Sequence, residues 1–390
     1  MSLEELGCGE YDVWVYLRGG IVPFGRIKFN SIQFSRRIDE VSTATVSLGI
    51  EGAKAYIASP RTPDMDVGPD TIETFMDNCC WMLSEINPWQ HELVIFRNGT
   101  MVWAGPIQTI EIDNSTGEAR IEADDVMKWF DRRFIRCEID MIDADLSMIW
   151  ASVFHSAHDI APVGLSMTIT KTGIKGERYY SPEQFRIAGD ELRELARTGL
   201  DWTCIGRTVI VGPQEINTPA IAMLTDIDFQ KAPTVIKSGI DTATRWVVGG
   251  GGGGADGPTY WAEVPTTLQN DPSFGLVERY VNEATIMDAD DPESSSRAAA
   301  QTRFDLLHAP IVYIRDGLLS QSAPVTMNEL VPGARIDLSL MEVCQPVIEQ
   351  YRLRDVDVSY KVEEGGGGVE EVKVTVTPLG TQKLTEDVNL

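Results

Sequence analysis

Two histidines and an aspartate near the middle of the chain have types and spacing that could bind a metal ion. His155, His158 and Asp159 stand at positions i, i+3 and i+4, which share one side of a helix. Imidazole and carboxylate groups are zinc ligands, but the other histidines, His91 and His308, lie far away in sequence, and no HExxH pattern occurs. A histidine near a helix C-terminus also interacts favourably with the helix dipole, and this structural interpretation is favoured.

Two other segments resemble ligand-binding loops only in part. Gly249–Gly254 is a run of glycines, but a phosphate-binding loop needs a following Lys-Ser/Thr pair, and Asp256 stands where phosphate would be repelled. A hairpin tip is favoured for this run. Asp288–Asp291 is rich in acids but lacks the central glycine and closing glutamate of an EF-hand. Asp291 and the following Pro292 instead have the pattern of a helix start.

Residues for hydrolysis or sugar binding follow no recognisable pattern. The sequence has no GxSxG motif and no evident Cys/His nucleophile pair, and among 59 acidic residues chance carboxylate pairs are expected. The nine tryptophans could form a sugar platform, but five lie in strand or helix patterns that indicate core packing: Trp14, Trp103, Trp129, Trp150 and Trp202. The six cysteines are scattered without a CxxC pair, as expected for reduced, buried side chains: Cys8, Cys79, Cys80, Cys137, Cys204 and Cys344. The sequence therefore assigns no catalytic, cofactor or metal residue and predicts that the protein is not an enzyme.

The strongest bulk property is a net charge of −26, from 33 basic and 59 acidic residues in a chain of 390. Proteins that hold DNA usually present a basic face, and the only paired arginines are Arg36-Arg37 and Arg132-Arg133. An acidic wall would let DNA slide past without sticking, although the charge could equally serve solubility alone. No apolar run approaches the roughly 20 residues that span a bilayer, and no signal peptide is evident. We therefore expect synthesis in a cytoplasm and no stable membrane insertion.

Alternating apolar and polar residues predict strands in the first third of the chain. Asn98-Gly99 is the strongest hairpin signal, and a second turn is predicted at Asn114–Gly117. A Pro/Asp/Gly-rich insertion is expected over 59–84. The predicted elements are strands at Tyr11–Leu17, Arg26–Arg37 (with a bulge at Asn30-Ser31) and Ser42–Ile50, a helix at Thr71–Leu83, the two hairpins, and a closing helix at Asp125–Arg136.

The middle of the chain changes to mixed helices and strands, and the last part returns to strands. An amphipathic helix capped by Asp145 and a second helix ending near Gly199 indicate an α+β module. The remaining predicted elements are strands at Ser166–Thr170, Asp201–Cys204, Thr208–Val211, Arg245–Val248, Tyr260–Val264, Ile311–Ile314, Arg335–Leu340, Tyr351–Val362 and Val369–Pro378, and a helix at Asp291–Leu307.

The first and last thirds share an organisation, because each ends in a long alternating hairpin and has one helix beside its strands. This predicts a β-rich α+β, multidomain protein with two β-barrel domains and an α+β insertion between them. The predicted domains are 1–137 with the insertion 59–84, then 138–220, then 221–390 with a helical and loop insertion over 249–308. A ring of such units would remove exposed sheet edges.

Four segments resemble the tail-hub family of long-tailed bacteriophages, known as minor tail proteins in phages of actinobacteria and related to baseplate hub proteins. Glu92–Pro106 is similar to the family's strand, Asn-Gly turn, strand and W-x-G-P signature. Leu330–Asp337 resembles its L-x-P-G-x-x-(V/I) strand entry. Tyr351–Val356 resembles the next strand, and Val374–Gly380 the closing strand. The order and spacing of these segments cover most of the chain.

The resemblance implies two tube-like β-barrel domains flanking smaller α+β domains, in a homotrimeric ring that adapts a sixfold tail tube to a threefold tip. It implies a virion tail-tip location after assembly in the host bacterial cytoplasm, and a lumen that DNA crosses only in transit. The expected partners are tail tube proteins, the tape-measure protein, and tip or spike proteins. Some relatives carry a peptidase or receptor-binding extension, which we expect on another protein here. The alternatives are a tail-tip cell-wall hydrolase and a receptor- or glycan-binding tail module.

Overall fold

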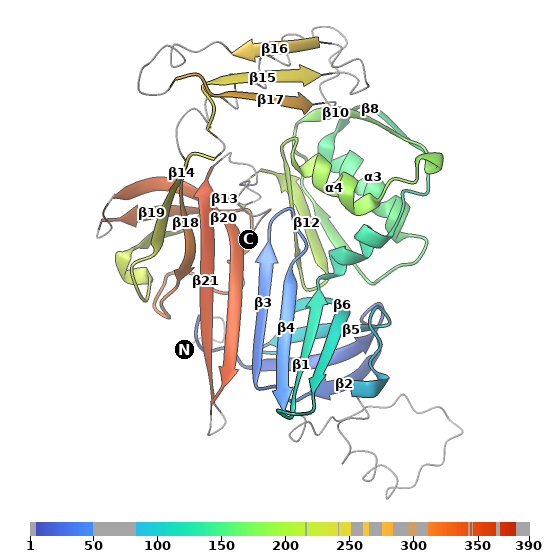
Figure 1. Ribbon diagram of the computed structural model, residues 1–390, viewed down its shortest axis with the longest axis vertical. Coiled ribbons are helices and arrows are strands. Elements are labelled where there is room, and N and C mark those ends of the chain that lie inside the picture. Colours follow the sequence, from blue (N-terminus) through green and yellow to red (C-terminus); the bar gives the residue numbers. More distant parts are fainter. Residues whose placement is uncertain are drawn as a thin grey trace, which may run out of the picture.

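Strands dominate the computed structural model, and they form one sheet of thirteen strands, two of three and one of two in the described part of the chain (Figure 1). No helix in that part is long and apolar enough to cross a bilayer. The structure describes residues 5–49, 83–214, 217–240, 242–250, 260–264, 275–283, 297, 300–301, 304, 311–341, 344, 346–363 and 367–379.

Seven strands make up the first third: β1 (Tyr11–Leu17), β2 (Pro23–Ile27), β3 (Ser31–Arg37), β4 (Thr43–Gly49), β5 (His91–Arg97), β6 (Thr100–Asp113) and β7 (Glu118–Asp124). Alternate side chains are buried, as in β4, where Val46 and Leu48 face the core. The β5–β6 hairpin confirms the prediction at Asn98 and Gly99, since both adopt the positive φ angles, 51° and 78°, that a tight hairpin turn requires.

The middle segment contains the helices: η1 (Val126–Arg132), β8 (Ile139–Asp145), α3 (Leu146–His158), β9 (Ser166–Ile169), β10 (Lys175–Tyr180), η2 (Pro182–Gln184), α4 (Ala188–Ala196), β11 (Leu200–Ile205) and β12 (Thr208–Pro213). The predicted cap of α3 is confirmed, because the Asp145 carboxylate accepts a hydrogen bond from the Ser147 amide at 3.0 Å. Helices α3 and α4 pack beside a three-stranded sheet of β9, β11 and β12.

The last part is mostly strands, with helical residues at 297, 300–301 and 304. Its described elements are β13 (Asn217–Thr225), η3 (Asp226–Asp228), β14 (Thr234–Ser238), β15 (Arg245–Gly250), β16 (Tyr260–Val264), β17 (Glu278–Glu283), β18 (Ile311–Leu318), β19 (Ala334–Leu340), β20 (Val347–Val362) and β21 (Gly368–Pro378). Strands β15, β16 and β17 form a separate small sheet at the top of Figure 1. Strands β20 and β21 form the longest hairpin, as the sequence predicted.

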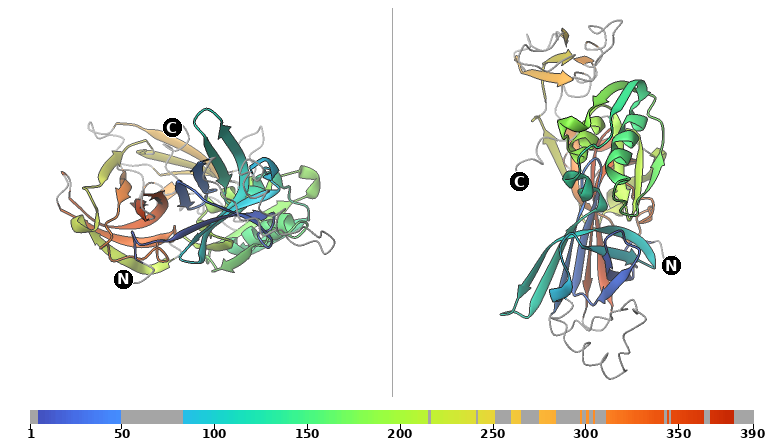
Figure 2. Two further views of the ribbon diagram at one scale, coloured as in Figure 1. Left: turned by 90° about the horizontal axis from the view of Figure 1, so that it is seen from below. Right: turned by 90° about the vertical axis from the view of Figure 1, so that its right-hand side faces the viewer.

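The first and last thirds meet where β3 pairs with β20 in antiparallel register, with Phe34 opposite Val358 and Ile32 opposite Tyr360. This pairing makes one sheet in the order β14-β18-β21-β20-β3-β4-β7-β6-β5-β1-β2, with β13 and β19 attached at β20. In the described residues the path is open, ending at β14 and β2. The β6–β7 and β20–β21 hairpins point to the same, lower end (Figure 1), and the view from below shows both thirds curving (Figure 2).

Two large apolar cores hold these parts together. The first lies behind the shared sheet and combines side chains of both outer thirds, including Val46, Ile121, Val358 and Val374. The second joins α3, α4 and β11 to η1 and to the outward side chains of β5 and β6. Phe130 of η1 stacks on Phe154 of α3 with ring centroids 4.7 Å apart. The middle segment is therefore packed onto the first third and does not stand apart.

Two local predictions differ from the structure. The expected long strand over Arg26–Arg37 is broken at 28–30, because β2 pairs with β1 whereas β3 pairs with β4 and β20. The expected helix over Asp125–Arg136 is the shorter 3-10 element η1, since Arg133 leaves helical geometry in extended backbone. Most of the insertion over 59–84 and of the expected helix over Asp291–Leu307 lies outside the described residues, and the described residues of these two segments, 83–84, 297, 300–301 and 304, are helical.

Candidate functional site

One face of the shared sheet is polar along six neighbouring strands, β21, β20, β3, β4, β7 and the Ile107–Asp113 part of β6. We call it the polar wall face. Its opposite side is the first apolar core, so strand alternation directs every second residue outward. Its residues are Glu371, Lys373, Thr375, Asp355, Asp357, Ser359, Lys361, Ser31, Gln33, Ser35, Arg37, Thr43, Thr45, Ser47, Glu118, Arg120, Glu122, Asp124, Thr109, Glu111 and Asp113.

Cross-strand neighbours on this face form continuous rows of short polar and charged side chains. In one row Ser359 stands beside Gln33, Gln33 beside Thr45, and Thr45 beside Glu122. The face carries eight carboxylates against four cationic side chains, so it is acidic like the chain as a whole. In the described part of the chain, one salt bridge joins two of its members, Arg120 Nη2 to Glu122 at 2.9 Å. Because the carboxylates outnumber their partners, the face repels other anions.

The polar wall face is hollowed where β21, β20, β3 and β4 run together. The hollow has a volume of about 280 Å³, and its lining includes Gln33, Thr45, Asp316, Asp357 and Lys373. Burial raises the pKa of Asp357 to about 6, and the neighbouring carboxylate of Asp355 adds to this effect. The hollow is therefore less negative in mild acid than at neutral pH.

The side chains of the polar wall face are suited to non-covalent contact with another molecule and not to a reaction with it. Its hydroxyls belong to serine and threonine side chains, and no histidine or cysteine is among its residues to activate them. In the described part of the chain, no group of three or more His, Cys, Asp or Glu residues is arranged to bind a metal ion. The arrangement can exclude phosphate groups and offer hydrogen bonds to water along its length.

A buried ion pair on the core side of the sheet, behind the polar wall face, holds the β20–β21 hairpin in place. Glu370 of β21 accepts hydrogen bonds from Arg97 of β5, at 2.8 Å from Nε and 3.0 Å from Nη2, and a further one from the Tyr11 hydroxyl. The Gly7 amide donates to the same carboxylate at 2.7 Å. Burial opposes ionisation, but these donors outweigh it and lower the pKa of Glu370. The pair therefore ties β21 of the last third to β1 and β5 of the first.

A second buried cluster lies where the middle segment meets the wall. Arg352 of β20 donates from Nη1 to both carboxylate oxygens of Asp201 on β11, at 2.9 Å each. Asp39, in the β3–β4 turn, accepts from the Trp202 amide at 2.8 Å. Burial and then the charge of Asp201 raise the pKa of Asp39 well above its usual value. Three segments that are distant in sequence therefore meet around one guanidinium.

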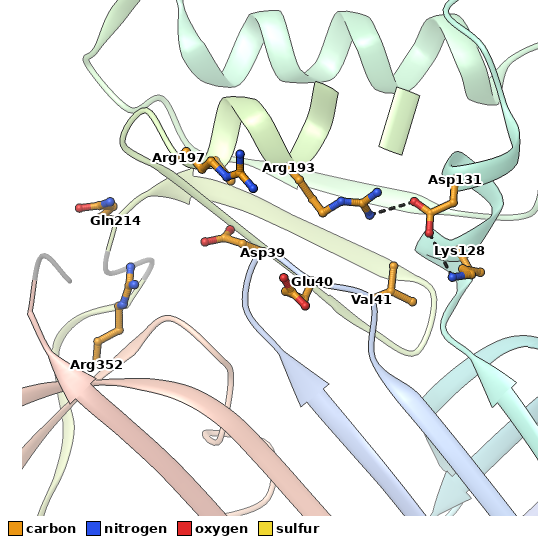
Figure 3. Close-up of a pocket in the computed structure, with 10 residues that line it drawn as sticks. Asp39, Glu40, Val41, Lys128, Asp131, Arg193, Arg197, Gln214 and Arg352 are labelled. Carbon is orange, nitrogen blue, oxygen red and sulfur yellow. Dashed lines mark ion pairs between the residues drawn. The ribbon is translucent and has the colours of Figure 1, made fainter. Parts of the chain in front are cut away.

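A pocket of about 340 Å³ opens beside this cluster (Figure 3). Its charged walls come from α4, η1 and the β3–β4 turn. Arg193 contacts Asp131 at 2.8 Å, and Lys128 contacts the same carboxylate at 3.2 Å. Arg197 pairs with Glu194 at 3.0 Å. Because these cations are already neutralised by the protein's own carboxylates, we assign no ligand to the pocket.

The residues first considered for chemistry are scattered over the structure. His155 and His158 lie at the end of α3, where each Nδ1 is within 3.4 Å of Asp159 Oδ1, and the His158 ring stacks on Phe154. Trp103, Trp129, Trp150 and Trp202 are buried and Trp14 is half-buried. Cys204 is buried, whereas Cys137 and Cys344 are exposed and Cys8 is half-buried. Of Gly249–Gly254 only the first two are described, in β15, and Asp288–Asp291 lies outside the described residues.

The buried charges were not identified from the sequence. Glu370 and Arg97 lie in strands with alternating polar and apolar residues. In such strands a charged side chain is usually expected to face solvent. One signal was available: in the alternation Val369-Glu370-Glu371-Val372, Glu370 shares a face with Val372 and hence with the core. The partners of Glu370 are strands far away in sequence, which no local pattern reveals.

Comparison with known proteins finds similar folds but no similar sequences. No protein-family model matches the chain, and no curated protein sequence matches it. A tail protein from Neisseria meningitidis MC58 is similar in structure, with a TM-score of 0.59 and 11% identity over 94% of this chain and 96% of that one. The 43 kDa tail protein of prophage MuSo2 from Shewanella oneidensis gives 0.58 and 11%, over 95% and 98%. The prophage tail protein gp18 from Listeria monocytogenes EGD-e gives 0.53 and 9%, over 97% of each chain. At these identities the similarity establishes a shared fold.

Proposed function

We propose that this chain is a structural hub subunit at the tail tip of a bacteriophage virion. In this proposal copies form a ring that joins the tail tube to the distal tip, and the polar wall face lines the channel through which DNA leaves. The observation that carries the proposal is the β3–β20 pairing, because it makes one continuous wall, apolar behind and acidic in front, from both outer thirds. The shared fold with phage tail proteins supports it.

The physical reason for an acidic channel is the charge of its cargo. DNA carries one negative charge per about 1.7 Å of helix axis, so a basic lumen would hold it through released counterions. With eight carboxylates against four cationic side chains, the polar wall face disfavours phosphate binding, and screening confines its repulsion to within about 10 Å of the wall. The role is therefore structural and does not involve catalysis.

The finer details of the proposal follow the family resemblance. The three domains are 1–137, 138–220 and 221–390, and the two outer ones act as consecutive β-barrel segments of the ring. The ring is a homotrimer that contacts tail tube proteins, the tape-measure protein, and tip or spike proteins. Subunits assemble in the host bacterial cytoplasm and remain at the virion tail tip.

Imaging tests the position of the chain. We expect electron microscopy of virions, with an epitope tag on this chain, to place it in a closed ring at the tail tip. Light scattering of the protein co-expressed with its tail partners should show a trimer. Stable monomers under these conditions would refute the proposal. Clearing of host peptidoglycan in a zymogram by the purified chain would favour the hydrolase alternative.

Lysine substitutions test the polar wall face directly. In virions carrying both Thr45→Lys and Glu122→Lys, DNA should bind the new cations, and delivery should fall on the order of tenfold while tails still assemble. Added salt should restore part of the delivery by screening. Glu138→Lys, on an exposed position of the middle segment, is the matched control. Equal delivery by the double variant and the control would contradict a lumen position for this face.

A further inference from the structure

Two exposed apolar clusters lie at opposite lateral ends of the molecule. The first, which we call the tip cluster, is in the turn between β1 and β2, on the right in Figure 1. It consists of Leu17, Ile21 and Val22, and Ile21 is 82% exposed. The turn is held in shape by backbone hydrogen bonds from Leu17 to Val22, at 2.9 Å, and from Gly20 to Leu17, at 3.0 Å. The tip cluster therefore projects from the molecule on a turn whose backbone conformation is held by hydrogen bonds.

The second cluster, the side patch, lies on the outer surface of β13, β19 and β20, on the left in Figure 1. It consists of Met223, Ile227, Met341 and Ile348, all more than half exposed. Ser339 of β19 pairs with Ile348, which places Ile348 near Met341 at the end of the same strand. The Met341 amide donates to Asp226 at 2.7 Å, which brings η3 and Ile227 beside them. Ile227, Met341 and Ile348 therefore lie close together, and Met223 lies on the same outer side, separated from Ile348 by Asp337 and Ser339 of β19.

Charges flank the two clusters with opposite sign. Arg18 stands in the tip turn and is exposed, and its guanidinium lies 5.8 Å from the centroid of the Trp129 ring. None of the salt bridges seen among the described residues includes Arg18. Asp226 flanks the side patch, whereas Asp337, which stands opposite Met223 in the sheet, already pairs with Arg335 at 3.3 Å. In a chain of net charge −26, a local match of Arg18 with Asp226 offsets repulsion between copies.

We propose that the tip cluster of one copy of this chain docks on the side patch of the next copy. The proposal rests on the ring put forward above and names the surfaces that close it. Exposed clusters of large apolar side chains mark interaction sites on soluble proteins. Two different surfaces at opposite ends give a head-to-tail contact, and such a contact closes into a ring when its rotation allows. Ile21 is the side chain inserted, and Ile348 is one of the side chains that receive it.

Cysteine cross-linking tests this contact. Ile21→Cys and Ile348→Cys are introduced together in the full chain, co-expressed with its tail partners, and treated with a short bismaleimide. We expect covalent dimers and larger species up to the closed ring. An equimolar mixture of the two single variants, both with the exposed Cys137 and Cys344 replaced by serine, should give dimers only, because each copy then has one engineered reactive end. Ile142→Cys combined with Ile348→Cys is the control, since Ile142 is 69% exposed but lies in neither cluster.

The outcomes separate this contact from the ring itself. Cross-linked species no more abundant than those of the control, or of the chain with its native cysteines alone, would overturn the docking. If imaging still shows a ring in that case, the proposed function stands and the contact lies elsewhere. Cross-links to a different tail protein would also refute contact between copies. Absence of any ring, with or without cross-links, counts against the proposed function.

Discussion

At the scale of single residues, buried ion pairs decide how distant segments meet. Arg97 with Glu370, and Arg352 with Asp201, have side chains that are at most 4% exposed. Transferring such charges from water into the protein interior is energetically unfavourable. The ion pair offsets this only when its geometry is good and all its hydrogen bonds are made. These pairs therefore add little net stability but strongly disfavour any arrangement that separates the partners.

Replacing Glu370 with glutamine should show this asymmetry. Glu370→Gln keeps the shape of the side chain but leaves Arg97 buried without an anion, so unfolding free energy should fall by about 3 kcal/mol at pH 7. Urea unfolding measures the change. Because the pKa of Glu370 is lowered in the folded protein, its contribution is present at neutral pH and is lost as the pH falls below about 4. Glu371→Gln on the polar wall face is the control, and equal effects of the two would contradict the prediction.

Asp357 should act in the opposite direction with pH. Its folded pKa of about 6 exceeds the unfolded value, so the native state binds the proton more tightly. Stability therefore falls as the pH rises from about 4 through 6. Asp357→Asn removes this loss and should be more stable than the parent at pH 7.5 by about 1 kcal/mol, a value reduced for partial solvent exposure. Asp113→Asn, whose parent carboxyl has a lowered pKa through Ser115, should show no such gain.

At the scale of elements, local sequence sets where strands and helices begin. The Asp145 carboxylate accepts from the Ser147 amide, and also from the amides of Thr172 and Gly173 at 3.1 and 2.8 Å. It thus caps α3 and anchors the loop before β10. Asp145→Ala should cost about 1 to 2 kcal/mol of unfolding free energy, measurable by thermal or urea unfolding. Asp159→Ala, at the other end of α3 and exposed, is the control, and an equal loss there would refute a capping role.

Local patterns also failed at specific elements, for physical reasons. The alternation over Arg26–Arg37 changes phase at Asn30-Ser31, which predicts a bulge within one strand, yet β2 and β3 are separate strands with different neighbours. A strand's own alternation does not identify its pairing partners. The segment after Asp125 has an apolar face suited to a helix, but the chain turns to extended backbone at Arg133. There the guanidinium donates to the Ala157 and Ala161 carbonyls near the end of α3. Tertiary contacts overrode a local preference in both cases.

At the scale of the whole molecule, the Arg352 cluster holds the middle segment against the wall. Arg352→Met should remove the guanidinium that donates to Asp201 and faces Asp39, and should release β11 from the β3–β4 turn. Hydrogen exchange at the Trp202 amide, which donates to Asp39, should become on the order of a hundredfold faster. Amides of the β3–β20 pairing should keep their protection. Uniform loss of protection, or an equal effect of Arg335→Met at the partly exposed β19 position, would contradict this prediction.

Local features of this protein could be predicted from residues close together in the chain. These are the Asn98-Gly99 hairpin, the cap of α3 and the long β20–β21 hairpin, while the acidic composition is a count over the whole sequence. The pairing of β3 with β20, the burial of Glu370 against Arg97 and the joining of six polar strand faces into one surface became evident from the three-dimensional arrangement alone. Strand pairing between distant segments depends on which strand edges meet during folding. Backbone N–H and C=O groups are the same in nearly every residue, so their hydrogen bonds do not identify the partner strand from the sequence.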